Sequence, residues 1–171
     1  MRRAEVVQPI GELEEAAPSG GRVVAIHLAS TSGAPMTTVD TVDAVAGRGL
    51  RGDRYFKGDG ASKRTPEPGR EVTLIEQEAI QNAAQEASID FQSTDSRRNI
   101  VTRGVALNDL VGREFRVGQA VLRGTELCEP CSHMIQLSGK RVLRSLVHHG
   151  GIRADIISDG LIQVGDAIEV P

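Results

Sequence analysis

The residues of this chain most suited to chemistry are two cysteines, Cys128 and Cys131, in the segment Leu-Cys-Glu-Pro-Cys at 127–131. A thiolate is a nucleophile, a sulfur carrier and a ligand for soft metals. Cysteines this close do not stabilise a fold as a disulfide, because the loop that they would close is too short to restrict the unfolded chain. The pair therefore indicates a reactive or metal-binding site.

The spacing of the two cysteines leaves three chemical interpretations open, besides two small buried side chains. Cys-x-Pro-Cys between a strand and a helix suggests a thioredoxin-type redox pair, although the chain that follows is short for that fold. A zinc site would combine Cys128 and Cys131 with two of His133, His148 and His149. In the third interpretation one cysteine is the reactive or metal-ligating thiol, and His133 could tune Cys131 or donate a proton.

Arginines in two glycine-bearing segments form the second candidate site. The chain has 17 Arg and 3 Lys, which a GC-rich genome explains in part, but arginine also binds phosphate through a planar fork that lysine lacks. Glycines let backbone N–H groups approach an anion. Neither segment matches a Rossmann or P-loop fingerprint. An anionic ligand pocket is expected from the arginines at 48–54 and 97–103, which are Arg48, Arg51, Arg54, Arg97, Arg98 and Arg103.

Composition argues against nucleic-acid and membrane partners. The net charge is −3, and the chain has three Phe, one Tyr and no Trp. Binding to phosphate backbones needs a basic surplus, and base stacking needs aromatic platforms. No apolar run approaches the ~20 residues of a membrane-spanning helix. No apolar signal segment follows Arg2 and Arg3, so we expect a reducing, cytoplasmic location.

Short strands must position these side chains. Strand-forming runs at 23–28, 35–46, 71–75 and 97–102 end at turn residues. Residues 115–122 and 162–169 share a Val-Gly-polar-Ala turn that leads into a strand. Residues 76–87 are good helix formers, and 132–149 predicts one interrupted helix or two short ones. A strand at 97–102 would direct alternate residues into a pocket and the others to water.

These elements predict a mostly β fold, a closed β-barrel with a few short helices. Residues 1–21 are expected to be a flexible lead-in, and 22–171 to be a single domain. The glycine-rich segment 47–69 lacks periodicity, which is more typical of a functional loop than of a spacer.

Five motifs follow one another along the chain in a specific order. They are Gly-Leu-Arg-Gly-Asp-Arg at 49–54, Arg-Glu-Val-Thr-Leu-Ile at 70–75, Arg-Arg-Asn-Ile-Val-Thr-Arg-Gly-Val-Ala-Leu-Asn-Asp-Leu at 97–110, Gly-Arg-Glu-Phe-Arg-Val-Gly at 112–118 and Leu-Cys-Glu-Pro-Cys at 127–131. The series resembles the MOSC domain, a family named after the C-terminal domain of molybdenum cofactor sulfurase. The resemblance covers about residues 22–170 and implies a closed MOSC-type β-barrel.

The resemblance also implies a ligand and an essential thiol. The ligand is the molybdenum cofactor, an anionic pterin (molybdopterin) that carries Mo, and the thiol binds molybdenum or carries sulfur as a persulfide. Cys131 best matches the position of that thiol, and Cys128 is the alternative. Arg97 and Asn99 match the family's Arg-x-Asn strand, Asn108 matches the Asn-Leu element that follows it, and Gly52 and Asp53 match the Gly-Asp loop. Together with the arginine segments, they give as expected cofactor-binding residues Arg48, Gly52, Asp53, Arg54, Arg97, Arg98, Asn99, Arg103 and Asn108.

Two activities occur in the family and are the functions that the resemblance implies. In sulfur transfer, a persulfide on Cys131 passes its sulfur to a metal centre, and a sulfur-donor protein would reload it. In the reduction of N-hydroxylated compounds, Cys131 holds the cofactor and a separate redox protein supplies electrons, because the chain has no flavin or iron–sulfur signature. The competing interpretation is a non-enzymatic, zinc-stabilised binding domain that uses Cys128, Cys131 and His148 or His149.

Overall fold

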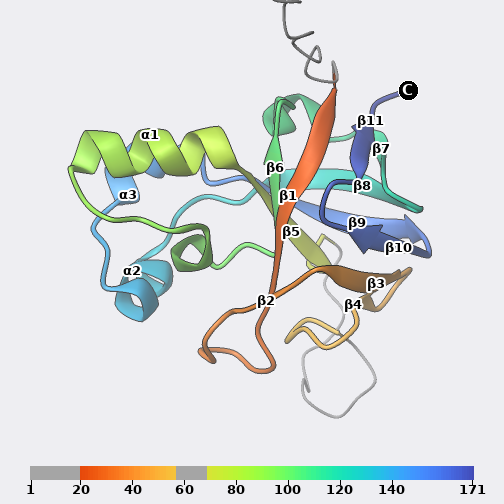
Figure 1. The fold of residues 1–171 in the computed structure, drawn as a ribbon, viewed down its shortest axis with the longest axis horizontal. Helices are drawn as coiled ribbons and strands as arrows, with labels where there is room; N and C mark the ends of the chain where they lie inside the picture. The colour runs from red at the N-terminus through yellow and green to blue at the C-terminus, as the bar shows by residue number, and fades with distance from the viewer. Residues whose placement is uncertain (1–19, 57–68) are drawn as a thin grey trace, which may run out of the picture.

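The computed structural model describes residues 20–56 and 69–171, in which seven strands close into a barrel with helices on one side (Figure 1). The barrel strands, in their order around it, are β11 (Ala167–Glu169), β7 (Glu114–Val117), β8 (Ala120–Leu127), β9 (Ile152–Ser158), β5 (Val72–Glu76), β6 (Ile100–Arg103) and β1 (Gly21–Leu28). β1 pairs with β11, as Gly21 opposite Ile168, and so closes the ring. The predicted closed β-barrel is confirmed.

The remaining elements attach to this barrel. β2 (Thr37–Val39) extends the sheet beside β1, and a second sheet has the order β10 (Gly160–Gln163), β3 (Thr41–Val45) and β4 (Gly49–Leu50). The helices are α1 (Gln77–Ala87), α2 (Ser132–Ser138) and α3 (Leu143–Leu146), with 3₁₀ helices η1 (Ser93–Ser96) and η2 (Leu107–Leu110). No helix of the described residues is long and apolar enough to span a membrane.

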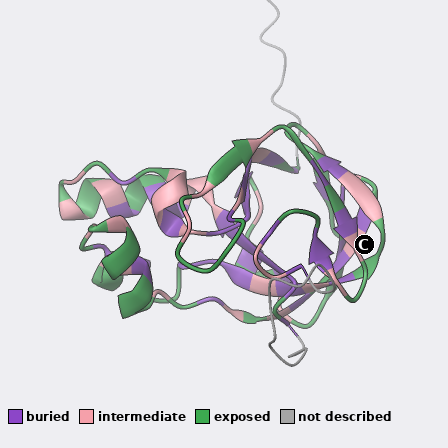
Figure 2. Cartoon of the chain, turned by 90° about the horizontal axis from the view of Figure 1, so that it is seen from below, coloured by how far each residue is buried: buried purple, intermediate pink, exposed green. Residues whose placement is uncertain are grey.

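Two hydrophobic clusters hold the fold together. One fills the barrel, where strands such as β7 alternate an inward Phe115 and Val117 with outward charged residues. The other lies between the barrel wall and the helices, and includes Ile75, Ile80 and Leu146. β5 separates the two clusters: Val72 and Leu74 face the barrel interior, and Ile75 faces the helices. Figure 2 shows the same division, with buried residues inside the barrel and exposed surfaces on the outer sides of the helices.

The structure refines several of the predicted boundaries. The run at 35–46 is two strands in different sheets, since β2 pairs with β1 and β3 pairs with β10. The segment 132–149 forms two short helices, and the helix predicted at 76–87 begins at Gln77. The loop 47–69 contains the short strand β4. Residues 57–68 of that loop, and 1–19 of the predicted lead-in, lie outside the described residues.

The prediction that a strand begins at Arg97 was wrong. Arg97 ends η1 in the left-handed conformation, with φ of 59°, and β6 begins only at Ile100. Because Arg97 lies in a turn, the expected alternation between pocket and solvent does not apply at this position. Arg97 and Arg98 both line the pocket described below.

A buried histidine connects β1, β2 and η1. His27 is 2% exposed; its Nδ1 lies 2.9 Å from the Thr38 hydroxyl, and its Nε2 lies 2.8 Å from the Ser93 hydroxyl. Burial lowers the pKa of His27 below its ordinary value of 6.5, because the charged imidazolium loses its hydration. The folded protein therefore holds this ring neutral.

This burial predicts a loss of stability in mild acid. Below the ordinary pKa of 6.5 the unfolded chain protonates at His27 before the folded chain does, so the free energy of unfolding falls with pH until the lower, folded pKa is passed. We expect His27→Gln to make the free energy of unfolding depend less steeply on pH between about pH 6.5 and pH 5, by at most about 1.4 kcal/mol per pH unit. Urea unfolding at several pH values measures this, with the exposed His149 mutated to Gln as the control. An unchanged slope in His27→Gln would contradict the assignment.

Candidate functional site

The predicted cysteines and several predicted arginines meet in a pocket of about 610 Å³ beside the barrel. This volume lies in the ~300–1,000 Å³ range of small-molecule sites. The walls come from the turn after β1, the loop after β4, the start of β5 and the chain just before it, the 97–98 segment, the chain between β8 and α2, α2 itself, and β9. The lining residues are Thr31, Ser32, Gly33, Arg54, Tyr55, Arg70, Thr73, Arg97, Arg98, Cys128, Glu129, Cys131, His133, Met134 and Arg153.

The lining of this pocket is strongly cationic. It includes five arginines and, among the described lining residues, a single carboxylate, Glu129. That carboxylate is already engaged by His148, whose backbone N–H donates to it at 3.0 Å and whose Nδ1 lies 3.1 Å from it. These contacts with His148 hold the pKa of Glu129 below its usual range. The arrangement favours an anionic ligand.

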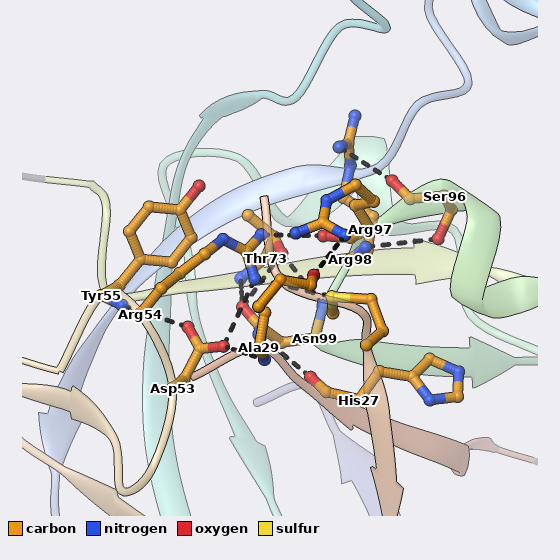
Figure 3. Close-up of polar contacts among 12 residues, drawn as sticks. His27, Ala29, Asp53, Arg54, Tyr55, Thr73, Ser96, Arg97, Arg98 and Asn99 are labelled. Atoms are coloured by element: carbon orange, nitrogen blue, oxygen red, sulfur yellow. Dashed lines mark hydrogen bonds and ion pairs between the residues drawn. The ribbon is translucent and has the colours of Figure 1, made fainter. Parts of the chain in front are cut away.

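Arg54 is fixed at the edge of the pocket by contacts on several sides (Figure 3). Its guanidinium lies 3.3 Å from the Asp53 carboxylate, donates to the Arg97 carbonyl at 3.0 Å, and stacks on the Tyr55 ring at 4.5 Å. The buried Asp53 also accepts from the N–H of Ala29 at 3.0 Å, and so ties this turn to the end of β1. Gly52, with φ of +89°, provides the left-handed turn residue just before Asp53. Asp53 and Gly52 therefore position Arg54.

Arg97 carries a buried donor with no partner among the described residues. Its Nη1 donates to the Ala34 carbonyl at 2.8 Å, whereas its Nη2 is buried and makes no hydrogen bond. Burial, and then the neighbouring Arg54 charge, lower the pKa of Arg97. An unsatisfied buried donor beside a second cation is unfavourable, and an anion bound between the two would satisfy both.

Arg98 is held within the pocket wall by backbone carbonyl groups. It is 7% exposed, and its guanidinium donates to the carbonyls of Gly150 at 2.8 Å, Cys128 at 2.9 Å, Ser96 at 3.1 Å and Glu129 at 3.5 Å. These acceptors belong to η1, to the cysteine segment and to the chain before β9. Arg98 was predicted to bind the ligand, but its donors are engaged in joining these three segments.

Asn99 plays a similar internal role. It is fully buried; its Oδ1 accepts from the N–H and the hydroxyl of Thr73, both at 3.1 Å, and its Nδ2 donates to the His27 carbonyl at 3.1 Å (Figure 3). These bonds fix the start of β6 between β1 and β5, and they orient Thr73, which lines the pocket. The Asn of the predicted Arg-x-Asn motif therefore joins neighbouring strands of the barrel wall, and the motif also contributes to the site.

The two cysteines have different environments. Cys128 is 3% exposed, and its N–H donates to the Gly151 carbonyl at 2.8 Å. A Cβ at Gly150 would lie 2.4 Å from the Cys128 carbonyl, so only glycine allows this close approach. Cys131 is exposed and immediately precedes α2, in which His133 is exposed and also lines the pocket. The accessible thiol is that of Cys131.

Several predicted ligand residues lie outside the pocket lining. Arg48 stacks on the Phe56 ring at 4.3 Å, and Arg51 pairs with Asp43 at 3.5 Å. The exposed Arg103 ends β6. Asn108 donates to the His148 carbonyl at 2.8 Å.

The sequence prediction also missed residues of the pocket. Arg70 opens the motif at 70–75 but was not assigned to the ligand, and Arg153 matches no motif. Both line the pocket, and the pairing of β5 with β9 brings their segments together. Tyr55 directly follows the predicted Gly-Asp-Arg motif, and this adjacency was the available signal. The turn at 31–33, which follows β1, lines the pocket together with the cysteine segment. No local sequence pattern indicates that these two segments meet.

Two alternative interpretations of the cysteine pair are not supported. Within the described residues, no three His, Cys, Asp or Glu side chains are grouped so as to hold a metal ion. His148, a proposed zinc ligand, instead contacts Glu129. A thioredoxin-type pair requires an open sheet of βαβ units, whereas the strands here close into a barrel.

The family model described as MOSC domain matches residues 61–169. Solved structures with the same fold include the YuaD protein of Bacillus subtilis, with a TM-score of 0.73 and 18% identity over 88% of this chain and 94% of that one. YiiM of Geobacillus stearothermophilus has a TM-score of 0.65 and 14% identity over 88% of this chain and 75% of that one. YiiM of Escherichia coli has a TM-score of 0.64 and 17% identity over 88% and 69%. A search of curated protein sequences gives no match.

The bonds of Arg98 predict a large effect on stability. Arg98→Met would leave buried carbonyls without donors, and each loss costs about 1–3 kcal/mol. We expect the free energy of unfolding to fall by about 3 kcal/mol or more, as measured by denaturant titration. The exposed Arg103, changed to Met, is the matched control and should alter stability by less than about 0.5 kcal/mol. Equal effects of the two substitutions would show that the carbonyl contacts do not hold the site together.

Proposed function

This chain belongs to the MOSC domain family, and on that premise we propose that its arginine-lined pocket binds the molybdenum cofactor, an anionic pterin, with Cys131 as the reactive thiol. The observation that carries the proposal is the buried Nη2 of Arg97, which lacks a partner among the described residues, in the pocket that the exposed Cys131 also lines. A phosphate offers the acceptors that this donor lacks.

The donor groups of the pocket fit such a ligand. Arg54 and Arg97 would hold the phosphate; Arg153 also lines the pocket, but its guanidinium lies 3.4 Å from the Glu126 carboxylate. The exposed thiol of Cys131 is not part of a cluster of His, Cys, Asp or Glu among the described residues. A single soft ligand suits a metal whose other ligands come with the cofactor rather than from the protein.

Each residue has a separate task in this proposal. Arg98 positions the backbone of the cysteine segment through the Cys128 and Glu129 carbonyls. His133, exposed near the thiol, can hold or release a proton at its ring nitrogens. When bound, the cofactor supplies a redox-active molybdenum centre.

Two activities are compatible with this arrangement. In the first, Cys131 holds the cofactor of a component that reduces N-hydroxylated compounds, with electrons from a separate redox protein. In the second, Cys131 carries sulfur as a persulfide for delivery to a metal centre. Both require the thiol to be accessible, as that of Cys131 is. We place this activity in the cytoplasm, where the free thiols of both cysteines would be maintained.

The cysteine assignment predicts unequal effects of two serine substitutions. In protein isolated from a host that makes the cofactor, we expect Cys131→Ser to lose bound molybdenum, because it removes the accessible soft ligand. Cys128→Ser should keep it, because that side chain is buried in the segment held by Arg98. Elemental analysis measures both. Molybdenum retained by Cys131→Ser and lost by Cys128→Ser would reverse the assignment, and stoichiometric zinc lost with either cysteine would overturn the proposal.

The unpartnered guanidinium predicts the site of the phosphate. We expect Arg97→Gln to lower the amount of pterin that copurifies by about tenfold or more, since a charge-assisted hydrogen bond of about 1.5–3 kcal/mol is lost. Fluorescence of the oxidised pterin, released by denaturation, gives the amount per protein. Arg103→Gln, outside the pocket, is the control. Equal pterin contents in the two variants would place the phosphate elsewhere.

A further inference from the structure

An exposed surface of mixed apolar and basic character lies beside the pocket. We define the α2–α3 face as the exposed side chains of residues 137–149. It includes three large apolar side chains: Leu137 is 38% exposed, Leu143 is 41% exposed and Val147 is 42% exposed. In Figure 1, α2 and α3 both lie on the side of the molecule away from β10 and β11, with α3 next to α1.

The charged side chains between residues 137 and 149 are basic: Arg141 and Arg144 belong to the face, and the half-buried Lys140 lies beside them. The nearest carboxylate in the sequence, Glu129, contacts His148 at 3.1 Å at one edge of the face. Arg141 and Arg144 are exposed, whereas the chain as a whole carries a net charge of −3. A local cationic surface on an acidic protein is a feature that steers association with an anionic partner.

The face is continuous with the rim of the pocket. Leu137 lies one helical turn after His133, which lines the pocket, so the two residues share one side of α2. On the other side of the rim, a Cβ at Gly33, also a lining residue, would lie 3.9 Å from Cδ2 of Leu137. A molecule seated on this face would therefore lie next to Cys131.

We propose that the α2–α3 face is the docking surface for an acidic redox protein that delivers electrons to the cofactor held at Cys131, an inference that rests on the proposed function. Its apolar side chains, surrounded by cations, match the apolar centre and charged rim of a protein–protein interface. The limited extent of the face suits a transient complex, which buries less than ~1,200 Å². The partner would present carboxylates around a small apolar patch.

Other macromolecules fit the face less well. Residues 137–149 contain no Phe, Tyr or Trp on which nucleic-acid bases could stack. α3 spans Leu143–Leu146, much shorter than the amphipathic helices that lie in membrane interfaces. A protein partner is therefore the occupant that the observations favour.

Site-specific photo-crosslinking in the native host tests the proposal. A photoreactive phenylalanine analogue replaces Val147 on the face, or Val164, which is 43% exposed outside it, as the matched control. We expect Val147 to crosslink to an acidic protein and Val164 not to. The captured protein, identified and purified, should bind the unlabelled chain with an affinity that falls at least tenfold when salt is raised from about 50 to about 300 mM. It should bind the Arg141→Glu/Arg144→Glu variant at least tenfold more weakly.

Each alternative outcome contradicts the docking surface. Crosslinking at Val147 no greater than at Val164, crosslinking to nucleic acid or lipid, or a captured protein indifferent to the charge reversal would overturn it. The assay does not depend on bound cofactor, so it is repeated in Cys131→Ser. Crosslinks that persist in Cys131→Ser support the docking surface independently of cofactor binding. If the wild-type protein then fails to retain cofactor, that result contradicts the proposed function and not the docking surface.

Discussion

The site depends on one buried cation, the guanidinium of Arg98. Placing a charge in a protein wall is costly unless polar groups replace its hydration. Here the replacement comes from backbone carbonyls of η1, of the cysteine segment and of the chain before β9. The cysteine segment and the chain before β9 are also joined by the Cys128 N–H, which donates to the Gly151 carbonyl, and the arginine ties both of them to η1. Its position follows from Asn99, whose amide fixes the start of β6 against Thr73 and His27.

The electrostatic character of the pocket follows from this use of neutral acceptors. Carbonyls solvate the Arg98 charge without cancelling it, and the lining carboxylate, Glu129, is engaged by His148. Arg54 is partly balanced by Asp53, whereas Nη2 of Arg97 is buried without a partner in the described part of the chain. The protein thus presents organised positive charge beside an accessible thiol. This combination is what the proposed anionic cofactor requires.

The fold and part of the site could be predicted from the sequence. Short β-rich runs with turn residues indicated a closed barrel, and the position of Cys131 before a helix followed from local patterns. The sequence could not predict that the side chains of Arg98 and Asn99 point into the barrel wall. Their acceptors are carbonyl groups of segments distant in sequence, which come together only when the barrel closes. The left-handed turn at Arg97 interrupted the expected strand. Arg153 joins the pocket only through the pairing of β9 with β5, a contact between segments distant in sequence.

We propose that the pocket and Cys131 together serve an anionic molybdenum–pterin ligand or the sulfur that it receives. Native mass spectrometry of the protein, isolated gently from a host that makes the cofactor, measures what the pocket holds. We expect an added mass that corresponds to a molybdenum-bearing pterin, or a single added sulfur located on the peptide that contains Cys131. A protein of unmodified mass, or one that carries only zinc, would contradict it.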